Sequence, residues 1–276
     1  MKLKSLLTRT VSGLIYCLIL VGCVLCGNMG VILLAALLST LACVELSKIN
    51  NELNWNTAPT LILDILGCYA LSVACLGWPM LCWMFVIMCR LIEQLYLHSD
   101  HPLKDLSASA FSQIYIGLPM AVMVSLSFYM HPNVILALLF FIWINDTGAY
   151  LVGSLIGKHR LFERISPKKS WEGFFGALIF TVGLGALFGA FYNGFFLGTA
   201  YMNIWLWMGF GAVVTVFGTW GDLVESMIKR DLKIKDSGNV IPGHGGILDR
   251  IDSLLLVLPA AAVYFFMVSY FTGFLG

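Results

Sequence analysis

The stretch from Asp222 to Asp252 concentrates acidic and basic side chains in a chain of which only 11% of the residues are charged. Apolar segments flank this stretch on both sides. Charged groups beside a bilayer are costly, and they usually mark a site for an ion or a polar substrate. Carboxylates and cations together with a glycine-rich turn are typical of metal-bound phosphate chemistry. The stretch is therefore the first candidate for an active site.

Polar residues at the start of this stretch recur with the spacing of a helix. They occupy positions i, i+3, i+4, i+7 and i+8, as Asp222, Glu225, Ser226, Lys229 and Arg230. This pattern predicts one polar helix face. Asp222 should lie within the inner part of the bilayer, where a lone carboxylate facing lipid is strongly disfavoured. It therefore needs a metal, a basic partner or a water-filled cavity, and a purely structural Asp–Lys pair is the alternative interpretation.

A glycine-rich turn follows at 242–246, with the sequence Pro-Gly-His-Gly-Gly. Its backbone N–H groups can approach a phosphate, or the glycines can permit a re-entrant turn. His244 is not expected to bind zinc, because no second ligand stands at the spacing of a tetrahedral site. Asp249 and Asp252 then open the last apolar run, where acidic residues also suit a helix dipole. Mg²⁺ prefers oxygen ligands, and Asp222 and Asp249 on two adjacent helices could supply them.

A second polar segment, from Gly157 to Gly173, carries five cations that could neutralise a polyphosphate: Lys158, Arg160, Arg164, Lys168 and Lys169. The alternative is a positive loop that serves only to set membrane topology. The adjacent Lys168 and Lys169 repel each other unless an anion is near, which favours a ligand role. Within the same segment, Ser166-Pro167 predicts a turn. Ser170 is the predicted cap of the next helix, with Glu172 in its first turn.

Composition places these segments in a membrane. The 276 residues are 59% hydrophobic, with a mean hydropathy of +0.89. These values predict an all-α, polytopic integral membrane bundle. We expect about nine transmembrane helices, at 11–26, 31–46, 61–76, 80–97, 111–130, 134–156, 174–192, 204–228 and 253–275. We expect a lipid bilayer around the protein and no nucleic acid as a partner.

The positions of the basic residues predict the topology. With the N-terminus inside and nine spans, all 16 Lys and Arg residues fall in inner connections or at inner helix ends. The N-terminus is therefore predicted to be cytoplasmic and the C-terminus outside. We expect residues 1–276 to form one membrane domain. Residues 1–130 carry no motif and are assigned to packing or dimerisation, whereas 131–276 hold the catalytic helices and two cytoplasmic loops.

Taken together, the residues predict metal-dependent phosphoryl or nucleotidyl transfer at the cytoplasmic face, with one lipid substrate. They do not identify the nucleotide. The segment from Ser226 to Asp252 resembles the signature of the phosphatidate cytidylyltransferases, the bacterial CDP-diacylglycerol synthases. The segment from Asp146 to Gly173 also resembles this family, apart from Ser154, where a basic residue is expected in many members.

The resemblance implies an enzyme of phospholipid biosynthesis in the bacterial inner membrane, with its active site facing the cytoplasm. It would convert CTP and phosphatidic acid to CDP-diacylglycerol and pyrophosphate. The resemblance also implies Mg²⁺, a second, monovalent cation such as K⁺, and a homodimer.

The resemblance assigns roles to individual residues of this chain. Asp222 and Asp249 become the metal ligands. The implied phosphate contacts are Lys229, Arg230, Lys235 and Arg250. The residues implied to shape the site are Ser226, Asp236, His244 and Asp252. Substrate binding is assigned to Lys168, Lys169, Gly245 and Gly246.

Two other interpretations stay open at the level of sequence. Another membrane enzyme that uses CTP on a lipid, such as a polyprenol kinase, shares the polar pattern and differs in lipid selectivity. An ion-coupled transporter would use Asp64, Asp146 and Asp222 as intramembrane carboxylates. It predicts flux without product, but the sequence shows no inverted repeat to support it. A lipid-binding scaffold without catalytic activity is less consistent with so complete a polar cluster.

Overall fold

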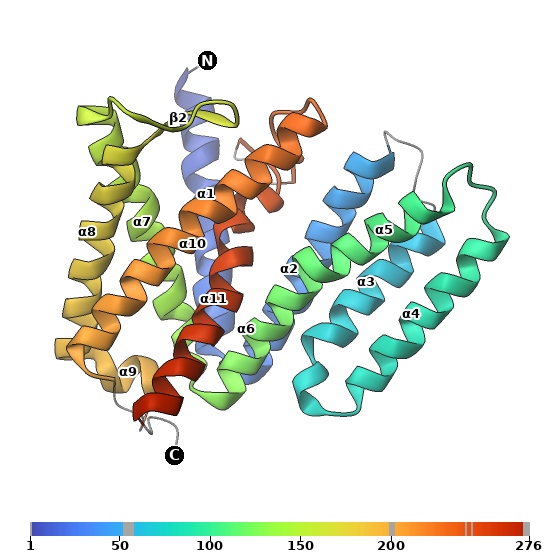
Figure 1. Ribbon diagram of the computed structural model, residues 1–276, viewed down its shortest axis with the longest axis horizontal. Helices are drawn as coiled ribbons and strands as arrows, with labels where there is room; N and C mark the ends of the chain where they lie inside the picture. Colours follow the sequence, from blue (N-terminus) through green and yellow to red (C-terminus); the bar gives the residue numbers. More distant parts are fainter. Residues whose placement is uncertain (1, 52–57, 199–201, 241, 244, 273–276) are drawn as a thin grey trace. The chain divides into compact units, whose positions relative to one another are not determined.

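The computed structural model describes residues 2–51, 58–198, 202–240, 242–243 and 245–272, most of them in helices (Figure 1). The chain divides into two compact units. The first unit comprises residues 1–125 and 236–250, and the second comprises 126–235 and 251–276. The segment 236–250, which contains most of the glycine-rich signature, therefore packs with the N-terminal helices.

Within the described residues, seven helical segments are long and apolar enough to cross a membrane: Gly27–Ile49, Pro79–Tyr96, Pro102–Tyr129, Val134–Ile156, Trp171–Leu197, Ile204–Asp231 and Leu248–Phe271. Two shorter apolar helices, Arg9–Leu25 and Ala58–Ser72, match the other two predicted spans. The prediction of an all-α, polytopic membrane protein is confirmed. The count of nine transmembrane helices and the orientation of the termini remain predictions.

The first unit is built from helices joined by short connections. These are α1 (Lys2–Leu25), α2 (Gly27–Asn51), α3 (Ala58–Ser72), the 3₁₀ turn η1 (Ala74–Leu76), α4 (Pro79–Tyr96), α5 (Pro102–Ser112) and the π-helical turn η2 (Gln113–Gly117). Helix α6 (Leu118–Tyr129) continues into the second unit. Gly27, the first residue of α2, has φ of 77°, a conformation that glycine adopts without steric cost.

One helix of the first unit begins earlier than predicted. The span expected from residue 111 starts at Pro102. The first turns contain polar residues, so the apolar run from which the span was predicted begins later than the helix. Asp105 and Ser109 are nevertheless buried, because Gln94 Nε2 donates to Asp105 Oδ2 at 3.2 Å and Arg90 Nε donates to Ser109 Oγ at 2.9 Å.

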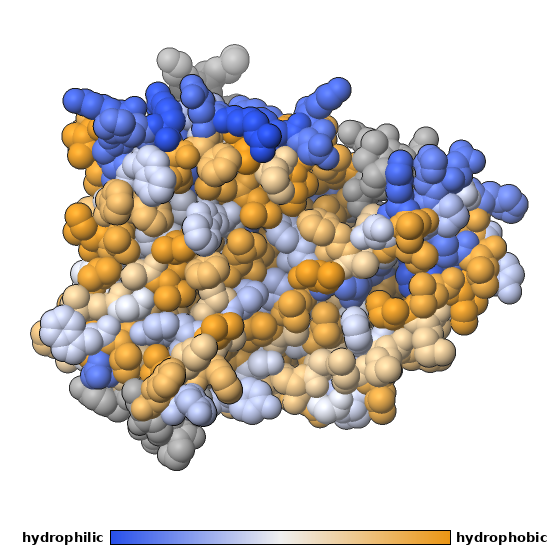
Figure 2. Space-filling model, viewed as in Figure 1, coloured by the Kyte–Doolittle hydropathy of each residue, from blue (hydrophilic) through white to orange (hydrophobic). Residues whose placement is uncertain are grey.

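The second unit carries the predicted catalytic helices. Its elements are α7 (Val134–Ile156), β1 (Arg160–Phe162), β2 (Ser166–Ser170), α8 (Trp171–Leu187), η3 (Phe188–Tyr192), α9 (Asn193–Leu197), α10 (Ile204–Asp231) and most of α11 (Leu248–Thr272). Helices α7, α8 and α10 pack against one another around the buried rings of Phe141, Trp207 and Phe210. Figure 2 shows hydrophilic side chains gathered at the end of this unit that carries β2, above largely hydrophobic helix flanks.

The connection between α7 and α8 is a small hairpin rather than a plain loop. Strands β1 and β2 pair antiparallel, with Arg160 opposite Ser170 and Phe162 opposite Ser166. The prediction of a turn at Ser166-Pro167 is wrong, because the turn occupies residues 163–165 and Ser166 begins β2. A two-stranded hairpin consists of edge strands only, so Pro167 is tolerated within it.

Candidate active site

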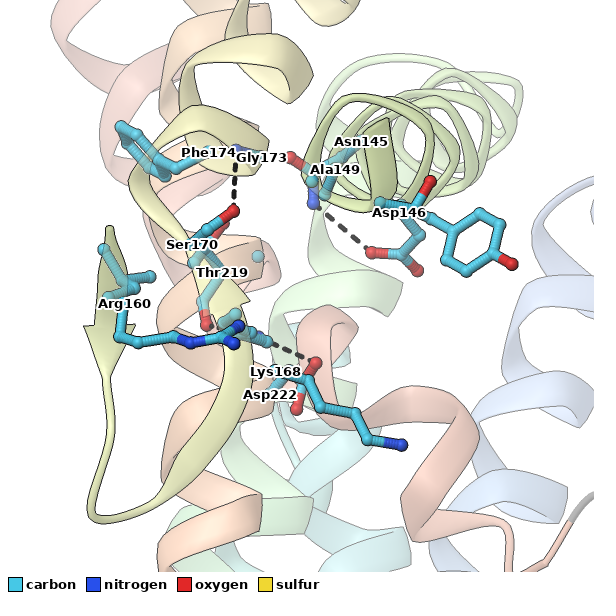
Figure 3. A pocket seen from close by; sticks show the side chains of 16 residues that line it. Asn145, Asp146, Ala149, Arg160, Lys168, Ser170, Gly173, Phe174, Thr219 and Asp222 are labelled. Carbon is cyan, nitrogen blue, oxygen red and sulfur yellow. Dashed lines mark hydrogen bonds and ion pairs between the residues drawn. The ribbon is translucent and has the colours of Figure 1, made fainter. Parts of the chain in front are cut away.

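A cavity of about 500 Å³ lies within the second unit, between α7, the β1–β2 hairpin, the start of α8, and α10 (Figure 3). Its charged lining residues are Asp146, Arg160, Lys168, Lys169 and Asp222. Four of them, Arg160, Lys168, Lys169 and Asp222, were candidate residues in the sequence analysis, from segments that are far apart in sequence. The cavity therefore presents cations and carboxylates to the same space, as a bound metal–phosphate complex requires.

The start of α8 and the hairpin hold the two lysines in place. The Ser170 Oγ accepts a hydrogen bond from Gly173 N at 3.2 Å, which confirms the predicted cap. Glu172 accepts hydrogen bonds from the backbone N–H groups of Lys158 and His159, at 3.1 and 3.2 Å. This carboxylate ties the end of α7 to the first turn of α8. Lys168 and Lys169 on β2 are thus carried by a segment that is fixed at both ends.

Asp222 on α10 pairs with Lys169 on β2. The Lys169 Nζ lies 2.7 Å from Asp222 Oδ2, and it also donates to Thr219 O at 3.2 Å. The Ser226 Oγ donates to Asp222 Oδ1 at 3.2 Å. The Asp222 side chain is 38% exposed, toward the cavity that it lines. Of the partners predicted for this carboxylate, the basic side chain and the cavity are both present.

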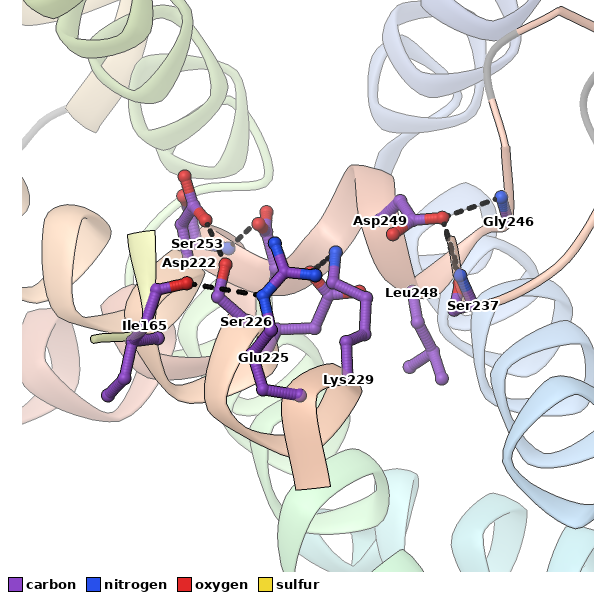
Figure 4. A network of polar contacts seen from close by, with 12 residues as sticks. Ile165, Asp222, Glu225, Ser226, Lys229, Ser237, Gly246, Leu248, Asp249 and Ser253 are labelled. Carbon is purple, nitrogen blue, oxygen red and sulfur yellow. Dashed lines mark hydrogen bonds and ion pairs between the residues drawn. The ribbon is translucent and has the colours of Figure 1, made fainter. Parts of the chain in front are cut away.

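The polar face of α10 continues beyond Asp222 as a second ion pair. Lys229 Nζ lies 2.6 Å from Glu225 Oε2, and Glu225 is buried (Figure 4). Arg230 Nε donates to the carbonyl oxygen of Ile165 at 3.4 Å, so the end of α10 contacts the hairpin turn. Lys229 thus balances the charge of a buried carboxylate. The assignment of Lys229 and Arg230 to phosphate contacts remains a prediction.

Two cavity residues on α7, Asn145 and Asp146, were given no role in the predicted enzyme site, although Asp146 begins the second segment that resembles the family. Asn145 Nδ2 donates to Asp146 Oδ1 at 3.3 Å. The Asn145 Oδ1 is buried and has no hydrogen-bond partner among the described residues. With Asp222, these side chains supply the oxygen ligands that Mg²⁺ prefers. The oxygen ligands of the cavity therefore fit a magnesium site. In the described parts of the chain, no group of three or more His, Cys, Asp or Glu residues is arranged to hold a metal ion.

Asp249 belongs to the first unit, where it organises the glycine-rich loop. Its Oδ2 accepts hydrogen bonds from Ser237 N at 2.9 Å, Ser237 Oγ at 3.0 Å and Gly246 N at 2.9 Å (Figure 4). Gly245 has φ of 85°, so this turn requires a residue without a Cβ. The Gly246 amide is engaged by Asp249, and phosphate binding by Gly245 and Gly246 remains a prediction.

The remaining predicted residues are placed as follows. Asp222 and Asp249 lie in different units, so a metal shared by the two carboxylates remains a prediction. Lys235, Asp236 and Arg250 are exposed. Asp252 Oδ1 accepts a hydrogen bond from Ser253 N at 2.6 Å. His244 lies outside the described residues.

Glu45 on α2 is a contact of the signature loop that was not predicted. It is 1% exposed. Its Oε1 accepts from Ile247 N at 2.7 Å, and its Oε2 accepts from Leu248 N at 3.0 Å. Its Oε2 also lies 3.1 Å from Ser237 Oγ, whose single O–H is shared between Glu45 and Asp249. The only signal in the sequence was a lone acidic residue within an apolar run.

The chain is similar to known proteins over most of its length. Residues 7–268 match the cytidylyltransferase family. The chain is 34% identical over 259 residues to the phosphatidate cytidylyltransferase of Staphylococcus epidermidis, covering 91% of this chain and 95% of that protein. It is 32% identical over 261 residues to the Staphylococcus aureus protein of the same name, with the same coverage. The extent of both matches, across both units, shows that the chain belongs to the cytidylyltransferase family.

Proposed function

We propose that this membrane protein is a phosphatidate cytidylyltransferase. It transfers CMP from CTP to phosphatidic acid and yields CDP-diacylglycerol and pyrophosphate. The observation that carries the proposal is the cavity of the second unit, in which Arg160, Lys168 and Lys169 face Asp146 and Asp222. A triphosphate and its metal need both kinds of group, and the relatives at 32–34% identity bear the name of this activity.

The three cations of the cavity bind the triphosphate of CTP in this proposal. Lys169 is already held at the cavity wall by Asp222, and it exchanges this carboxylate for a phosphate oxygen when CTP enters. The exchange frees Asp222 for a cation at the moment at which the phosphates arrive. Lys168 and Arg160 contact the same anion from the hairpin, where opposite charges strengthen each hydrogen bond.

By the family resemblance, Asp222 and Asp249 are the residues that would each bind Mg²⁺. When bound, the ion would offset the charge on the phosphates and on the leaving group. K⁺ as a second cation belongs to the same proposal. The phosphatidate oxygen attacks the α-phosphorus of CTP, the new P–O bond forms, and the bond to pyrophosphate breaks. The attacking oxygen is already anionic, so the chain needs no general base, and its cations orient and neutralise the phosphates.

The proposal places the protein in the inner membrane of a bacterium with the cavity open to the cytoplasm, where CTP is available. Support comes from the positions of the basic residues and from the bacterial relatives. We also propose that the protein acts as a homodimer, which rests on the family resemblance alone.

The test uses the detergent-solubilised full chain with phosphatidic acid, labelled CTP and Mg²⁺. We expect labelled CDP-diacylglycerol and pyrophosphate in equal amounts, and loss of both when Asp222 is replaced by Ala. Lys104→Ala, which changes an exposed lysine of the first unit, is the control. A folded wild type without product would refute the proposal. Product from a polyprenol but not from phosphatidic acid would identify another CTP-dependent lipid enzyme.

A further inference from the structure

Glu45 is a buried carboxylate from the part of the chain that carries no motif. It lies on α2, and its hydrogen-bond donors lie about 200 residues later in the chain, in the segment from Ser237 to Leu248. A carboxylate buried to this extent is strongly destabilising unless it is well hydrogen-bonded. A residue that is needed only to fill the interior would be apolar. The presence of a carboxylate at this position is therefore explained by the loop that Glu45 contacts.

The donors to Glu45 are arranged to hold an anion. Ile247 N and Leu248 N are consecutive amides at the start of α11, and each donates to a different oxygen of the carboxylate. Unpaired N–H groups at a helix N-terminus favour a negative charge. Glu45 thus caps α11 from a neighbouring helix, and it fixes where α11 begins.

The contact with Glu45 continues directly to Asp249. The Ser237 Oγ lies 3.1 Å from Glu45 Oε2 and 3.0 Å from Asp249 Oδ2. Three successive amides divide between the two carboxylates, because Gly246 N donates to Asp249 whereas Ile247 N and Leu248 N donate to Glu45. The loop is therefore held from both sides, and Asp249 cannot rotate without breaking bonds that Glu45 helps to align.

Two glycines of the signature are explained by the same carboxylate. A Cβ on Gly246 would lie 2.5 Å from Glu45 Oε2 and would also collide with Ser237 Oγ. A Cβ on Gly238 would lie 2.7 Å from Glu45 Oε1. Both distances are too short for a real side chain. Gly238 and Gly246 therefore allow the backbone of the loop to close over Glu45.

We infer that Glu45 is a positioning residue for Asp249. It clamps the loop from Ser237 to Leu248 so that the Asp249 carboxylate is presented in one orientation to the cation that the reaction needs. This inference rests on the proposed function, in which Asp249 holds Mg²⁺. Groups that orient a metal ligand are typically worth 10- to 100-fold in metal affinity.

The test compares Glu45→Gln with Asp105→Asn as the matched control. Asp105 is a buried carboxylate of the same unit, and its hydrogen bond comes from Gln94, outside the loop. Glutamine keeps the shape of glutamate but turns an NH₂ group toward one of the two amides. We expect the Mg²⁺ concentration for half-maximal activity to rise at least about tenfold in Glu45→Gln and to stay unchanged in Asp105→Asn.

A second readout does not depend on activity. Hydrogen exchange of the Ile247 and Leu248 amides should accelerate in Glu45→Gln and remain at the wild-type rate in Asp105→Asn. Ser237→Ala removes the hydroxyl between the two carboxylates without changing the backbone amides, and it should shift the Mg²⁺ requirement in the same direction. This variant serves as the test if Glu45→Gln does not fold.

The outcomes separate the two proposals. A wild type that makes no product refutes the proposed function, and the exchange measurement then decides alone whether Glu45 holds the loop. An active wild type with an unchanged Mg²⁺ requirement in Glu45→Gln or Ser237→Ala overturns the positioning role. Unchanged exchange at Ile247 and Leu248 overturns the clamp itself.

Discussion

The Lys169–Asp222 ion pair could serve stability or catalysis, and one substitution distinguishes the two roles. We consider Lys169→Met, which keeps the length of the side chain and removes its charge. With an effective dielectric constant of about 20, two unit charges 4 Å apart attract each other by about 4 kcal/mol. However, the side chains are 24% and 38% exposed, and the net contribution of such pairs to stability is about 0–1 kcal/mol. The substitution should therefore lower the unfolding temperature only slightly.

Activity should respond much more strongly than stability. If Lys169 binds the triphosphate and stabilises the charge that develops during transfer, its loss should reduce kcat/KM for CTP by about 100-fold, or about 2.7 kcal/mol. The assay is CDP-diacylglycerol formation at several CTP concentrations, with thermal unfolding in the same detergent. Lys104→Met is the control.

The opposite pattern would refute this reasoning. A purely structural pair predicts a fall in unfolding temperature with kcat/KM reduced less than about threefold. It also predicts that Lys169→Met and Asp222→Asn together cost no more stability than either alone, because each change removes the same interaction.

Three further changes test the fold and the site. Gly246→Ala should reduce activity at least tenfold, since its Cβ would collide with Ser237 and Glu45; product formation under saturating Mg²⁺ measures this loss. Ser170→Ala removes the cap of α8 and should cost about 1 kcal/mol of stability, measured by denaturant unfolding. Trp207→Ala removes one buried ring from the aromatic core of the second unit and should lower the free energy of unfolding by about 3–5 kcal/mol in the same measurement.

Each of these predictions has a result that contradicts it. Wild-type activity in Gly246→Ala would mean that the loop tolerates a side chain beside Glu45. No change in stability for Ser170→Ala would show that the hairpin holds α8 without the cap. A loss below about 1 kcal/mol for Trp207→Ala would mean that neighbouring rings fill the space.

Much of the fold is readable from sequence because burial in lipid requires long apolar segments. Residues 134–156 were predicted as one span, and α7 has the same bounds. The prediction was less accurate where polar residues are buried inside the protein. Asp105 and Ser109 lie in the first turns of the Pro102–Tyr129 span, but their hydrogen bonds to Gln94 and Arg90 come from another helix.

In the candidate site, too, contacts between neighbours in sequence were predictable and contacts between distant segments were not. The residue types and spacings of Asp222, Ser226 and Ser170 determined their local contacts, because helix caps and i,i+4 pairs depend only on neighbours in sequence. The pairing of Lys169 with Asp222 joins a strand to a helix, so it needs the packing of α7, α8 and α10.

The sequence by itself determined the membrane class, the approximate helices and the chemical nature of the site, since these follow from hydropathy and local motifs. Only the tertiary structure decided that Glu45 on α2 meets the loop around Ser237, and that Asn145 and Asp146 line the cavity with Asp222. The physical reason is that a buried carboxylate finds its hydrogen-bond donors in space. The residues next to it in the chain, Val44 and Leu46, are apolar and do not indicate that partner.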